Sequence, residues 1–545
     1  MEKILVCSAW PYASNVPHLG NLIGSLLSGD VFLRYYRLKG YEALHVSGSD
    51  THGTHIEYEA FKRRISPREL ATTVHQQILE ILKAFEIDMF YTTTEHPTHY
   101  RFIQEIYLKM EANGYIFPRD EERAYCASCQ KFLADRFIQG TCPRCGSPNA
   151  YGNQCDDCGA LLEPEELLQP KCRICGKDEI IFKRTRNWYL DLPKLEPELR
   201  AFLTSRAFGE NVQRFTEGLL AQGLRPRAVT RDLEWGIPAP FAGAAGKVFY
   251  VWAENALGYV SATIQSFADR ADPEGWKEFW LTDEAKHIYT QGKDNIPFHT
   301  IFFPAQLLAS REGYHLPDQI SATEFLNWIG GAQFSKTRGV GIYCDEALKL
   351  LDPILWRFYL LYARPEKKDV DFSWEELEKA VNGVFIGNIS NLVNRVIALA
   401  NRLYDGRVEA TVEGRVLEEI ERTKREVERE IEGGALAGAL RRITELALFG
   451  NRYFQEERPW EGERPGVLAS GLQLVKALGI LLEPFVPSFS KAVYRMLNLE
   501  RPTFADIARV TPEFRVERAV PLLQKIKVEE IERRYAALKG DGSSR

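Results

Sequence analysis

The first 117 residues alternate between short apolar runs and longer segments with one apolar face. Ile4–Val6 and Ala43–Val46 are apolar runs of strand length. Apolar residues recur every three or four positions in three longer segments, which predicts helices at Leu22–Leu38, Pro67–Phe85 and Tyr100–Asn113. This alternation of strands and helices predicts a doubly wound α/β domain, in which ligands bind beyond the carboxyl ends of parallel strands.

The pattern is lost after residue 117 and returns about 110 residues later. Residues 118–190 are rich in Cys, Gly and Pro, and a helical stretch follows them. Phe249–Trp252 (FYVW) and His287–Thr290 (HIYT) are again apolar runs of strand length. We therefore expect an insertion that divides the α/β domain into two halves.

From about residue 345 the pattern is helical throughout. Polar or Pro-containing breaks separate six expected helices: Asp352–Arg364, Trp374–Leu403, Val416–Glu432, Leu436–Glu456, Val467–Leu482 and Ser488–Leu497. This arrangement is typical of a helix bundle. The charged tail, Lys525–Arg545, is expected to fray.

Composition narrows the class of protein. A chain of 545 residues is long enough for three or four domains, and 45% hydrophobic with 26% charged residues is typical of a soluble globular protein. The net charge of −6 does not suggest a nucleic-acid-binding protein, although an acidic enzyme can keep a basic face. The N-terminus lacks the apolar core of a signal peptide and no run of about 18 apolar residues stands out, so we expect a cytoplasmic protein.

The ten cysteines predict metal sites. Cys7 and Cys344 stand alone and are expected to be buried. The other eight form four CxxC pairs: Cys126 and Cys129, Cys142 and Cys145, Cys155 and Cys158, Cys172 and Cys175. Four thiolates close the coordination shell of a structural zinc ion, so we expect two structural zinc sites and no catalytic one. Pairing in sequence order is the simplest arrangement, and crossed pairing stays open.

Two motifs follow the first two strands. His18-Leu19-Gly20-Asn21 opens the first helix, and a helix N-terminus suits a phosphate. A neutral His18 could donate to a phosphate oxygen, and Gly20 would leave room for a base or ribose. In the second motif, GSDTHG, Asp50 could pair with a substrate ammonium group or simply cap the next helix.

Later candidates lie beside strand ends and in one glycine-rich loop. Trp252, Tyr259 and His299 could be core aromatic residues, but their places beside FYVW and GKDNIPFH favour a ligand pocket. The loop WIGGAQFSKTRG carries Lys336, which could swing onto a triphosphate or remain a solvated surface lysine.

Taken together, HLGN and FSKTR resemble the two signature motifs of the class I aminoacyl-tRNA synthetases, HIGH and KMSKS. Asn21 stands in place of the second His, and Gln333 and Thr337 in place of the outer Lys and Ser. With AWPY, FYVW, GKDNIPFH and the four CxxC pairs, the chain resembles the methionyl-tRNA synthetase family, in its form with two knuckles. Among the departures, Glu254-Asn255-Ala256 stands where Asp-Ala-Pro is common.

The resemblance implies that methionine and Mg-ATP give methionyl-adenylate, and that the methionyl group passes to the terminal adenosine of tRNA(Met). The implied catalytic residues are His18, Asn21, Ser335 and Lys336. ATP would also contact Gly20 and Thr337. The implied methionine-binding residues are Trp10, Tyr12, Asp50, Trp252, Tyr259 and His299. The CAU anticodon would be recognised by Trp460 with Asn391, Asn394 or Arg395.

The resemblance also implies a domain plan. A Rossmann-like catalytic domain would occupy 1–117 and 231–325, with a zinc-knuckle insertion at 118–230. A region with the KMSKS loop and stem contacts would span 326–385, and an all-α anticodon-binding bundle would span 386–545. Two alternatives remain at this point: another class I synthetase, such as the cysteine enzyme, or a HIGH-type nucleotidyltransferase. A monomer is the default expectation, without a membrane partner.

Overall fold

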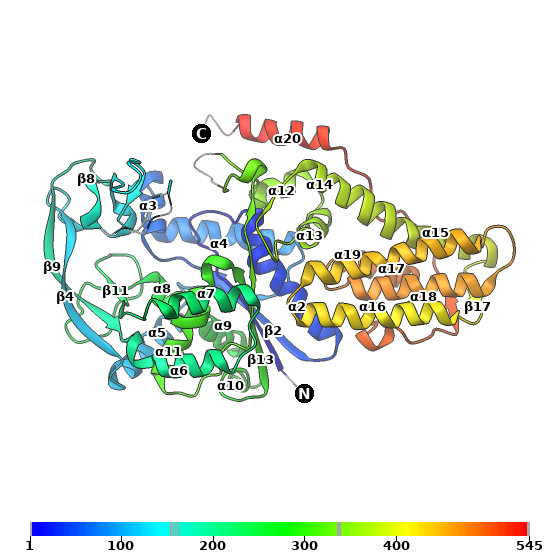
Figure 1. Cartoon of the computed structure of the whole chain (residues 1–545), viewed down its shortest axis with the longest axis horizontal. Helices are drawn as coiled ribbons and strands as arrows, with labels where there is room; N and C mark the ends of the chain where they lie inside the picture. Colours follow the sequence, from blue (N-terminus) through cyan, green and yellow to red (C-terminus); the bar gives the residue numbers. More distant parts are fainter. Residues whose placement is uncertain are drawn as a thin grey trace.

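The computed structural model of the chain describes residues 3–152, 155, 157–158, 160, 162, 164–334 and 339–541. Its centre is a parallel five-stranded sheet in the order β14-β13-β1-β2-β3 (Figure 1). The strands are β1 (Lys3–Ser8), β2 (Glu42–Ser49), β3 (Phe90–Thr93), β13 (Ala285–Gly292) and β14 (Gln319–Thr323). The predicted α/β domain is therefore confirmed, and its strands come from both sides of the insertion.

Strand β1 lies in the middle of this sheet and is buried along its whole length. Ile4 and Val6 pack into one hydrophobic core, whereas Leu5 and Cys7 pack into the other. Both faces of the sheet are covered, which explains a continuous apolar run instead of an alternating one. Cys7 and Cys344 are both buried, as expected.

The predicted helices flank this sheet. Those before the insertion are α1 (Leu19–Asn21), the π-helical turn η1 (Leu22–Leu26), α2 (Leu27–Leu38), α3 (Thr54–Arg63), α4 (Pro67–Ala84) and α5 (Pro97–Ala112). Those after it are α6 (Leu192–Thr204), α7 (Glu210–Ala221), α8 (Val251–Glu254), the turn η4 (Asn255–Leu257), α9 (Gly258–Phe267), α10 (Trp276–Trp280), the turns η5 (Lys293–Asn295) and η6 (Phe298–Phe302), and α11 (Phe303–Ser310).

The prediction of a strand over Phe249–Trp252 is wrong beyond its first residue. Strand β12 spans Val248–Phe249 and pairs with β11 (Thr230–Arg231), and α8 then begins at Val251. Tertiary contacts override the strand propensity here. The Trp252 ring stacks on Phe298, with the ring centroids 4.0 Å apart.

The insertion is built on a long antiparallel pair, β4 (Ile116–Cys126) and β9 (Ile180–Leu190). The pair runs away from the parallel sheet and carries the cysteine knuckles at its far end (Figure 1). Short strands complete the insertion: β5 (Lys131–Phe132), β6 (Ile138–Thr141), β7 (Ala150–Tyr151), β8 (Leu168–Cys172) and β10 (Arg227–Ala228), with short turns at Asp135–Phe137 and Pro164–Glu166.

The C-terminal half is a helix bundle at the opposite end of the molecule (Figure 1). Its elements are α12 (Cys344–Leu350), α13 (Pro353–Tyr362), α14 (Trp374–Glu378), the π-helical η8 (Lys379–Ser390), α15 (Asn391–Tyr404), α16 (Gly414–Glu432), α17 (Leu436–Glu457), α18 (Pro465–Leu482) and α19 (Pro487–Met496). Short pairs join its segments: β15 (Leu326–Asn327) with β16 (Val370–Asp371), and β17 (Arg407–Glu409) with β18 (Glu513–Arg515). All six predicted helices are present.

Two bundle helices, Trp374–Tyr404 and Pro465–Leu482, are long and apolar enough to cross a membrane by length and composition alone. In Pro465–Leu482, 89% of the most apolar window is buried inside the fold. This burial explains the apolar composition of that helix, because it forms the core of the bundle.

The expectation of a frayed tail is wrong over most of its length. Val528–Asp541 forms helix α20, which packs on α12 and α14 (Figure 1). Tyr535 Oη donates to the Gly341 carbonyl at 3.1 Å, and Lys539 pairs with Glu346 at 2.6 Å. These contacts are absent from any local pattern, because they join residues almost 200 positions apart.

Candidate active site

The HLGN motif begins helix α1 as predicted. His18 is the N-cap: its Nδ1 accepts from the Asn21 backbone N–H at 3.2 Å, and Asn21 Oδ1 accepts from the His18 N–H at 3.3 Å. Burial lowers the pKa of His18 to about 4, so the ring is neutral near pH 7. Because Nδ1 is the acceptor, the proton lies on Nε2, which remains available as a donor.

The two motifs predicted to share a nucleotide meet at this helix start. The Phe334 ring stacks on the His18 ring with centroids 4.5 Å apart. On the other side of the loop, Leu19 N–H donates to the Ile342 carbonyl at 3.2 Å, and Cys344 N–H donates to the Pro17 carbonyl at 2.9 Å. Both flanks of the FSKTR loop therefore contact HLGN. Ser335, Lys336 and Thr337 themselves lie outside the described residues.

A cavity of about 540 Å³ opens at the carboxyl ends of β1 and β13, beside this helix start. It is lined by the following residues predicted for the site: Trp10, Tyr12, His18, Gly20, Asn21, Trp252, Tyr259 and His299. A Cβ added to Gly20 would lie 3.0 Å from the His18 ring, so glycine lets this ring lie close against the start of α1. Sequence reasoning missed other lining residues, among them His55, Asn255, Phe298 and Tyr343.

One end of the cavity is aromatic. Tyr12 meets the Trp252 ring edge-on at 5.9 Å, and Trp252 stacks on Phe298. Deeper in the wall, Tyr259 Oη lies 2.9 Å from His299 Nε2, while His299 Nδ1 lies 3.0 Å from the Asn295 carbonyl. Burial lowers the pKa of His299 to about 4. The neutral ring therefore donates from Nδ1 and accepts from Tyr259, which leaves this end apolar and uncharged.

Asp50 differs from its predicted place. Its side chain is fully buried, and it is not among the residues that line the cavity. Instead Asn255 Nδ2 donates to Asp50 Oδ2 at 2.7 Å, and Asn255 faces the cavity. Burial, with the nearby charge of Glu254, raises the pKa of Asp50 to about 8. The carboxyl group therefore lies one layer behind the cavity wall.

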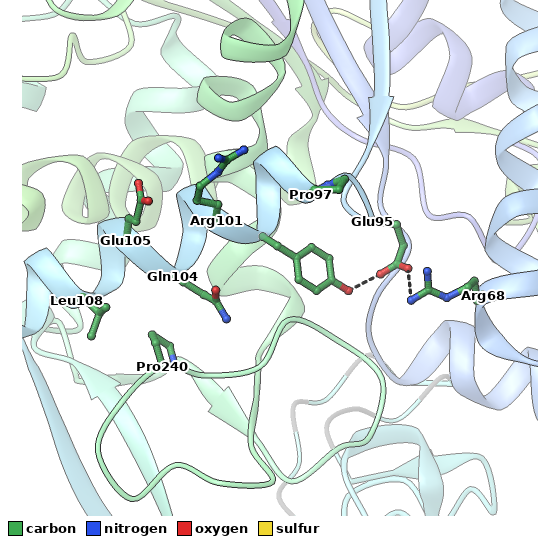
Figure 2. Close-up of a pocket in the computed structure, with 9 residues that line it drawn as sticks. Arg68, Glu95, Pro97, Arg101, Gln104, Glu105, Leu108 and Pro240 are labelled. Carbon is green, nitrogen blue, oxygen red and sulfur yellow. Dashed lines mark hydrogen bonds and ion pairs between the residues drawn. The ribbon is translucent and has the colours of Figure 1, made fainter. Parts of the chain in front are cut away.

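A buried network of polar side chains continues from Asp50 towards the surface. Glu254 accepts from His52 Nδ1 and from His99 Nε2, each at 2.6 Å. His52 Nε2 lies 2.8 Å from Glu95, which also accepts from Tyr100 and pairs with Arg68 at 2.9 Å. Figure 2 shows this outer end, where Glu95 and Arg68 border a second, open cavity.

The charges in this buried network offset one another. Burial alone would lower the pKa of His52, but Glu254 and Glu95 raise it to about 10. Burial opposes the ionisation of Glu254, yet the two histidines lower its pKa to about 2. An imidazolium thus lies between two carboxylates, as buried charges require. The sequence analysis did not predict this network, although His52 lies within the GSDTHG motif that it singled out.

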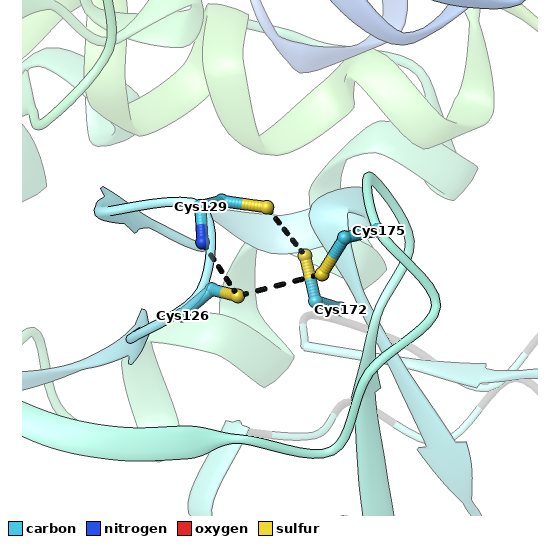
Figure 3. A group of neighbouring side chains, drawn as sticks. All are labelled: Cys126, Cys129, Cys172 and Cys175. Atoms are coloured by element: carbon cyan, nitrogen blue, oxygen red, sulfur yellow. Dashed lines mark hydrogen bonds between the residues drawn. The ribbon is translucent and has the colours of Figure 1, made fainter.

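The eight cysteines form two groups, and the simplest predicted pairing is wrong. Cys126, Cys129, Cys172 and Cys175 surround one point, as Figure 3 shows. Cys142, Cys145, Cys155 and Cys158 surround another. The first and last pairs meet because β4 and β9 run antiparallel, with Cys126 opposite Ile180. The knuckles are therefore nested and not sequential.

In both groups the distances between sulfur atoms fit the tetrahedral coordination of one metal ion. Within each group the sulfur atoms lie within 4.8 Å of one another. Opposite sulfurs are 3.7–3.8 Å apart, as for Cys126 with Cys175 and Cys142 with Cys158. Zinc–sulfur bonds of about 2.3 Å place tetrahedral ligands about 3.8 Å apart. Each group can therefore hold one zinc ion without a position left for a substrate.

The residues predicted for the anticodon lie in the bundle. Trp460 follows α17 and its side chain is 38% exposed. Asn391, Asn394 and Arg395 lie on α15, where Arg395 Nη2 donates to Asn451 at 3.2 Å. Asn391 is exposed, whereas Asn394 and Arg395 are half-buried. Trp460 therefore offers an exposed aromatic face, and α15 carries the amide and guanidinium groups.

A parallel sheet with HLGN and the flanks of a second motif around one cavity are typical of a class I aminoacyl-tRNA synthetase. The family described as class I tRNA synthetases (M) matches residues 4–397. Methionine–tRNA ligases are the similar proteins: that of Caldivirga maquilingensis is 44% identical over 97% of this chain and 92% of its own length.

Two further relatives are also methionine–tRNA ligases. The Thermofilum pendens methionine–tRNA ligase is 44% identical over 97% of this chain and 96% of its own, and that of Korarchaeum cryptofilum is 42% identical over 99% and 98%. The structure of Mycobacterium tuberculosis methionyl-tRNA synthetase with methionyl-adenylate shares the fold, with a TM-score of 0.78 at 21% identity over 96% of this chain and 99% of that one. The chain belongs to the methionine–tRNA ligase family.

Proposed function

We propose that this chain activates methionine with ATP and transfers the methionyl group to the terminal adenosine of tRNA(Met). The observation that carries the proposal is the shared cavity. His18, the aromatic wall around Trp252 and both flanks of the FSKTR loop surround one space. A nucleotide and a small apolar amino acid fit such a space side by side.

In the first step the methionine carboxylate attacks the α-phosphorus of ATP, and pyrophosphate leaves. His18 donates from Nε2 to a phosphate oxygen, and the Asn21 side chain holds the start of α1. Gly20 admits the nucleotide. Lys336, with Ser335 and Thr337, stabilises the triphosphate as negative charge builds. No side chain acts as a nucleophile, so the rate comes from positioning and charge stabilisation.

The amino acid end discriminates by shape and polarity. Tyr12, Trp252, Tyr259 and His299, with Trp10 beside them, surround the thioether. Sulfur–aromatic contacts favour methionine, and a neutral His299 adds no charge that would attract a polar competitor. Asp50 supplies negative charge for the substrate ammonium from behind the wall.

The two cysteine groups hold structural zinc, one ion each. Four thiolates fix the far end of the β4–β9 pair, which has few apolar residues of its own. Among the described residues no cysteine lines the cavity, which argues against a synthetase that uses zinc to select its substrate. The alternative of a cysteine enzyme is thereby disfavoured.

Transfer requires tRNA, and the bundle provides the second contact. Trp460 would stack on an unpaired base of the CAU anticodon, and Asn391, Asn394 or Arg395 would bond to base edges. We place this chemistry in the cytoplasm, where tRNA and ATP are available.

Aminoacylation of a tRNA with a CAU anticodon tests the whole proposal. The purified chain, radiolabelled methionine, Mg-ATP and this tRNA should give acid-precipitable label. A tRNA with one changed anticodon base should be charged far more slowly. Absence of charging, together with absence of methionyl-adenylate, would contradict the proposal.

A further inference from the structure

Helix α3 lies between the cavity and the cysteine knuckles (Figure 1). Its first turn carries His55, which lines the cavity. One turn further on, Tyr58 packs against the small hydrophobic core of the knuckles and meets the Phe137 ring edge-on at 6.1 Å. Residues three apart are neighbours on a helix surface, so the same side of α3 faces both the cavity and the knuckles.

Arg173 joins the knuckles to this helix. It directly follows Cys172, one of the four cysteines in the group that Figure 3 shows. Its guanidinium carbon lies 3.9 Å from the centre of the Tyr58 ring, and its Nη2 donates to Tyr58 Oη at 2.6 Å. The same carbon lies 4.8 Å from the centre of the Tyr151 ring in the other knuckle. A planar guanidinium group is well suited to such stacking between aromatic rings.

The knuckle fixes the position of Arg173 itself. Its backbone N–H donates to the Phe137 carbonyl at 2.9 Å, and its Nη1 donates to the Arg136 carbonyl at 3.0 Å. A zinc ion bound by Cys172 and Cys175 would also fix the two residues between them. The guanidinium group therefore reaches α3 from a backbone whose place depends on this group of cysteines.

The other end of α3 packs against the aromatic end of the cavity. The His55 ring lies 5.6 Å from the Tyr12 ring, which meets Trp252 edge-on at 5.9 Å. Gly53, the N-cap of α3, has a φ of 91°, and a Cβ there would lie 3.2 Å from the Val251 side chain. Val251 directly precedes Trp252. A shift of α3 would therefore change the shape of this wall.

We propose that Arg173 is a positioning residue, which holds α3 through Tyr58 and so fixes the aromatic wall at the amino acid end of the cavity. The proposal rests on the proposed activation of methionine at that wall. It gives the group of Cys126, Cys129, Cys172 and Cys175 an influence on substrate affinity, although none of these four cysteines lines the cavity.

Pyrophosphate exchange by Arg173→Ala tests the proposal. The KM for methionine should rise about tenfold, because small displacements of a binding wall are costly, whereas the KM for ATP should stay within about twofold. Elemental analysis should still find two zinc ions per chain. Arg173→Lys keeps the charge but loses the planar stack, so its methionine KM should lie between those of the wild type and Arg173→Ala.

Arg144→Ala is the matched control. Arg144 also lies between two cysteines of one group, Cys142 and Cys145, and its side chain is exposed. This variant should change neither the two KM values nor the zinc content. It separates the contact with α3 from any general effect of removing an arginine from a knuckle.

A partner variant tests the contact from the catalytic half. Tyr58→Leu keeps an apolar side chain against the knuckle core but removes the ring and hydroxyl that Arg173 contacts. It should raise the methionine KM to a similar extent, and adding Arg173→Ala should cause no further loss. If Arg173→Ala did not keep both zinc ions, Tyr58→Leu, which leaves the knuckle sequence unchanged, would decide the matter alone.

Three outcomes would overturn the proposal: an unchanged methionine KM in a variant that keeps both zinc ions, equal increases in the KM values for methionine and ATP, or additive losses in the double variant. A wild-type chain without methionine-dependent exchange would contradict the proposed function itself. In an active wild type, the three outcomes contradict only the role of Arg173.

Discussion

His18 combines two roles in one side chain. It caps α1 through Nδ1, and we propose that its Nε2–H donates to a phosphate oxygen. We predict that His18→Ala lowers the rate of methionine-dependent pyrophosphate exchange about 100-fold, the usual loss for one donor to transition-state charge. His18→Asn keeps a capping side chain and a donor, so it should retain more activity than His18→Ala. Equal losses in both variants would mean that the imidazole is irreplaceable for another reason.

Trp460 lies far along the chain from this chemistry. We predict that Trp460→Ala lowers kcat/KM for tRNA about 10- to 100-fold, since one base–aromatic stack contributes about 1–3 kcal/mol. Pyrophosphate exchange without tRNA should be unchanged. Leu448, 46% exposed on α17, gives a matched control, and Leu448→Ala should alter neither assay. A parallel loss of exchange and charging would show that Trp460 is structural.

At the scale of elements, the nested knuckles make a countable prediction. The wild type should contain two zinc ions per chain by elemental analysis. The variant Cys142→Ser/Cys158→Ser removes two ligands of the same group and should keep one ion. Sequential pairing would place these cysteines in different groups, and the variant would then lose both ions. Cys7→Ser should keep two.

Helix α20 contacts both ends of the loop that carries Lys336. The Tyr535 ring lies 5.4 Å from Trp328, and its hydroxyl donates to Gly341. We predict that Tyr535→Ala slows pyrophosphate exchange about tenfold, because small errors in the position of a catalytic group are costly. Among the residues that the structure describes, Arg533 bonds only to its own helix, at the Glu529 carbonyl, so Arg533→Ala is the control. If the two variants behaved alike, α20 would have no influence on the loop.

Elements with a strong local pattern could be predicted from the sequence. The β1 strand, the helix start at His18 and the six bundle helices were predictable because apolar periodicity and capping residues are local. The short β12 strand, the nested cysteines and α20 were not. Each depends on a partner distant in sequence: Phe298 for Trp252, β9 for Cys126, and Gly341 for Tyr535.

The same distinction between local patterns and distant contacts holds for the candidate site. Motif residues placed most of the cavity wall, because strand ends meet at one edge of a parallel sheet. The depth of each side chain was not predictable, which is why Asp50 was expected at the wall that Asn255 occupies. The buried network from Glu254 through His52 to Glu95 joins separate segments, so no single motif predicted it.

At the scale of the whole molecule, one buried arginine joins the catalytic half to the bundle. Arg357 on α13 donates to Asp30 on α2 at 2.7 Å, to the Phe85 carbonyl at 2.7 Å and to the Phe485 carbonyl at 2.9 Å. Its side chain is fully buried. Segments from four parts of the chain thus meet at one guanidinium group.

We predict that Arg357→Met destabilises the protein by about 3–5 kcal/mol, the usual cost of breaking a buried ion pair. The urea midpoint of unfolding should fall accordingly. Arg214 pairs with Glu210 on the surface, where the two side chains are 71% and 83% exposed. Arg214→Met should therefore change stability by less than about 1 kcal/mol. Similar midpoints for both variants would contradict the role given to Arg357.

In the proposed function the halves joined in this way serve one reaction: the cavity is proposed to activate the amino acid, and the bundle is proposed to select the tRNA. The separation explains why variants at Trp460 and at His18 should fail in different assays. It also means that the first step can be measured without tRNA.

Pyrophosphate–ATP exchange with each of the twenty amino acids, supplied one at a time, tests the central claim most directly. The account predicts exchange with methionine far above that with any other amino acid, because the aromatic wall of Tyr12, Trp252 and His299 fits an uncharged thioether. Exchange supported by cysteine or another amino acid, with none for methionine, would contradict it.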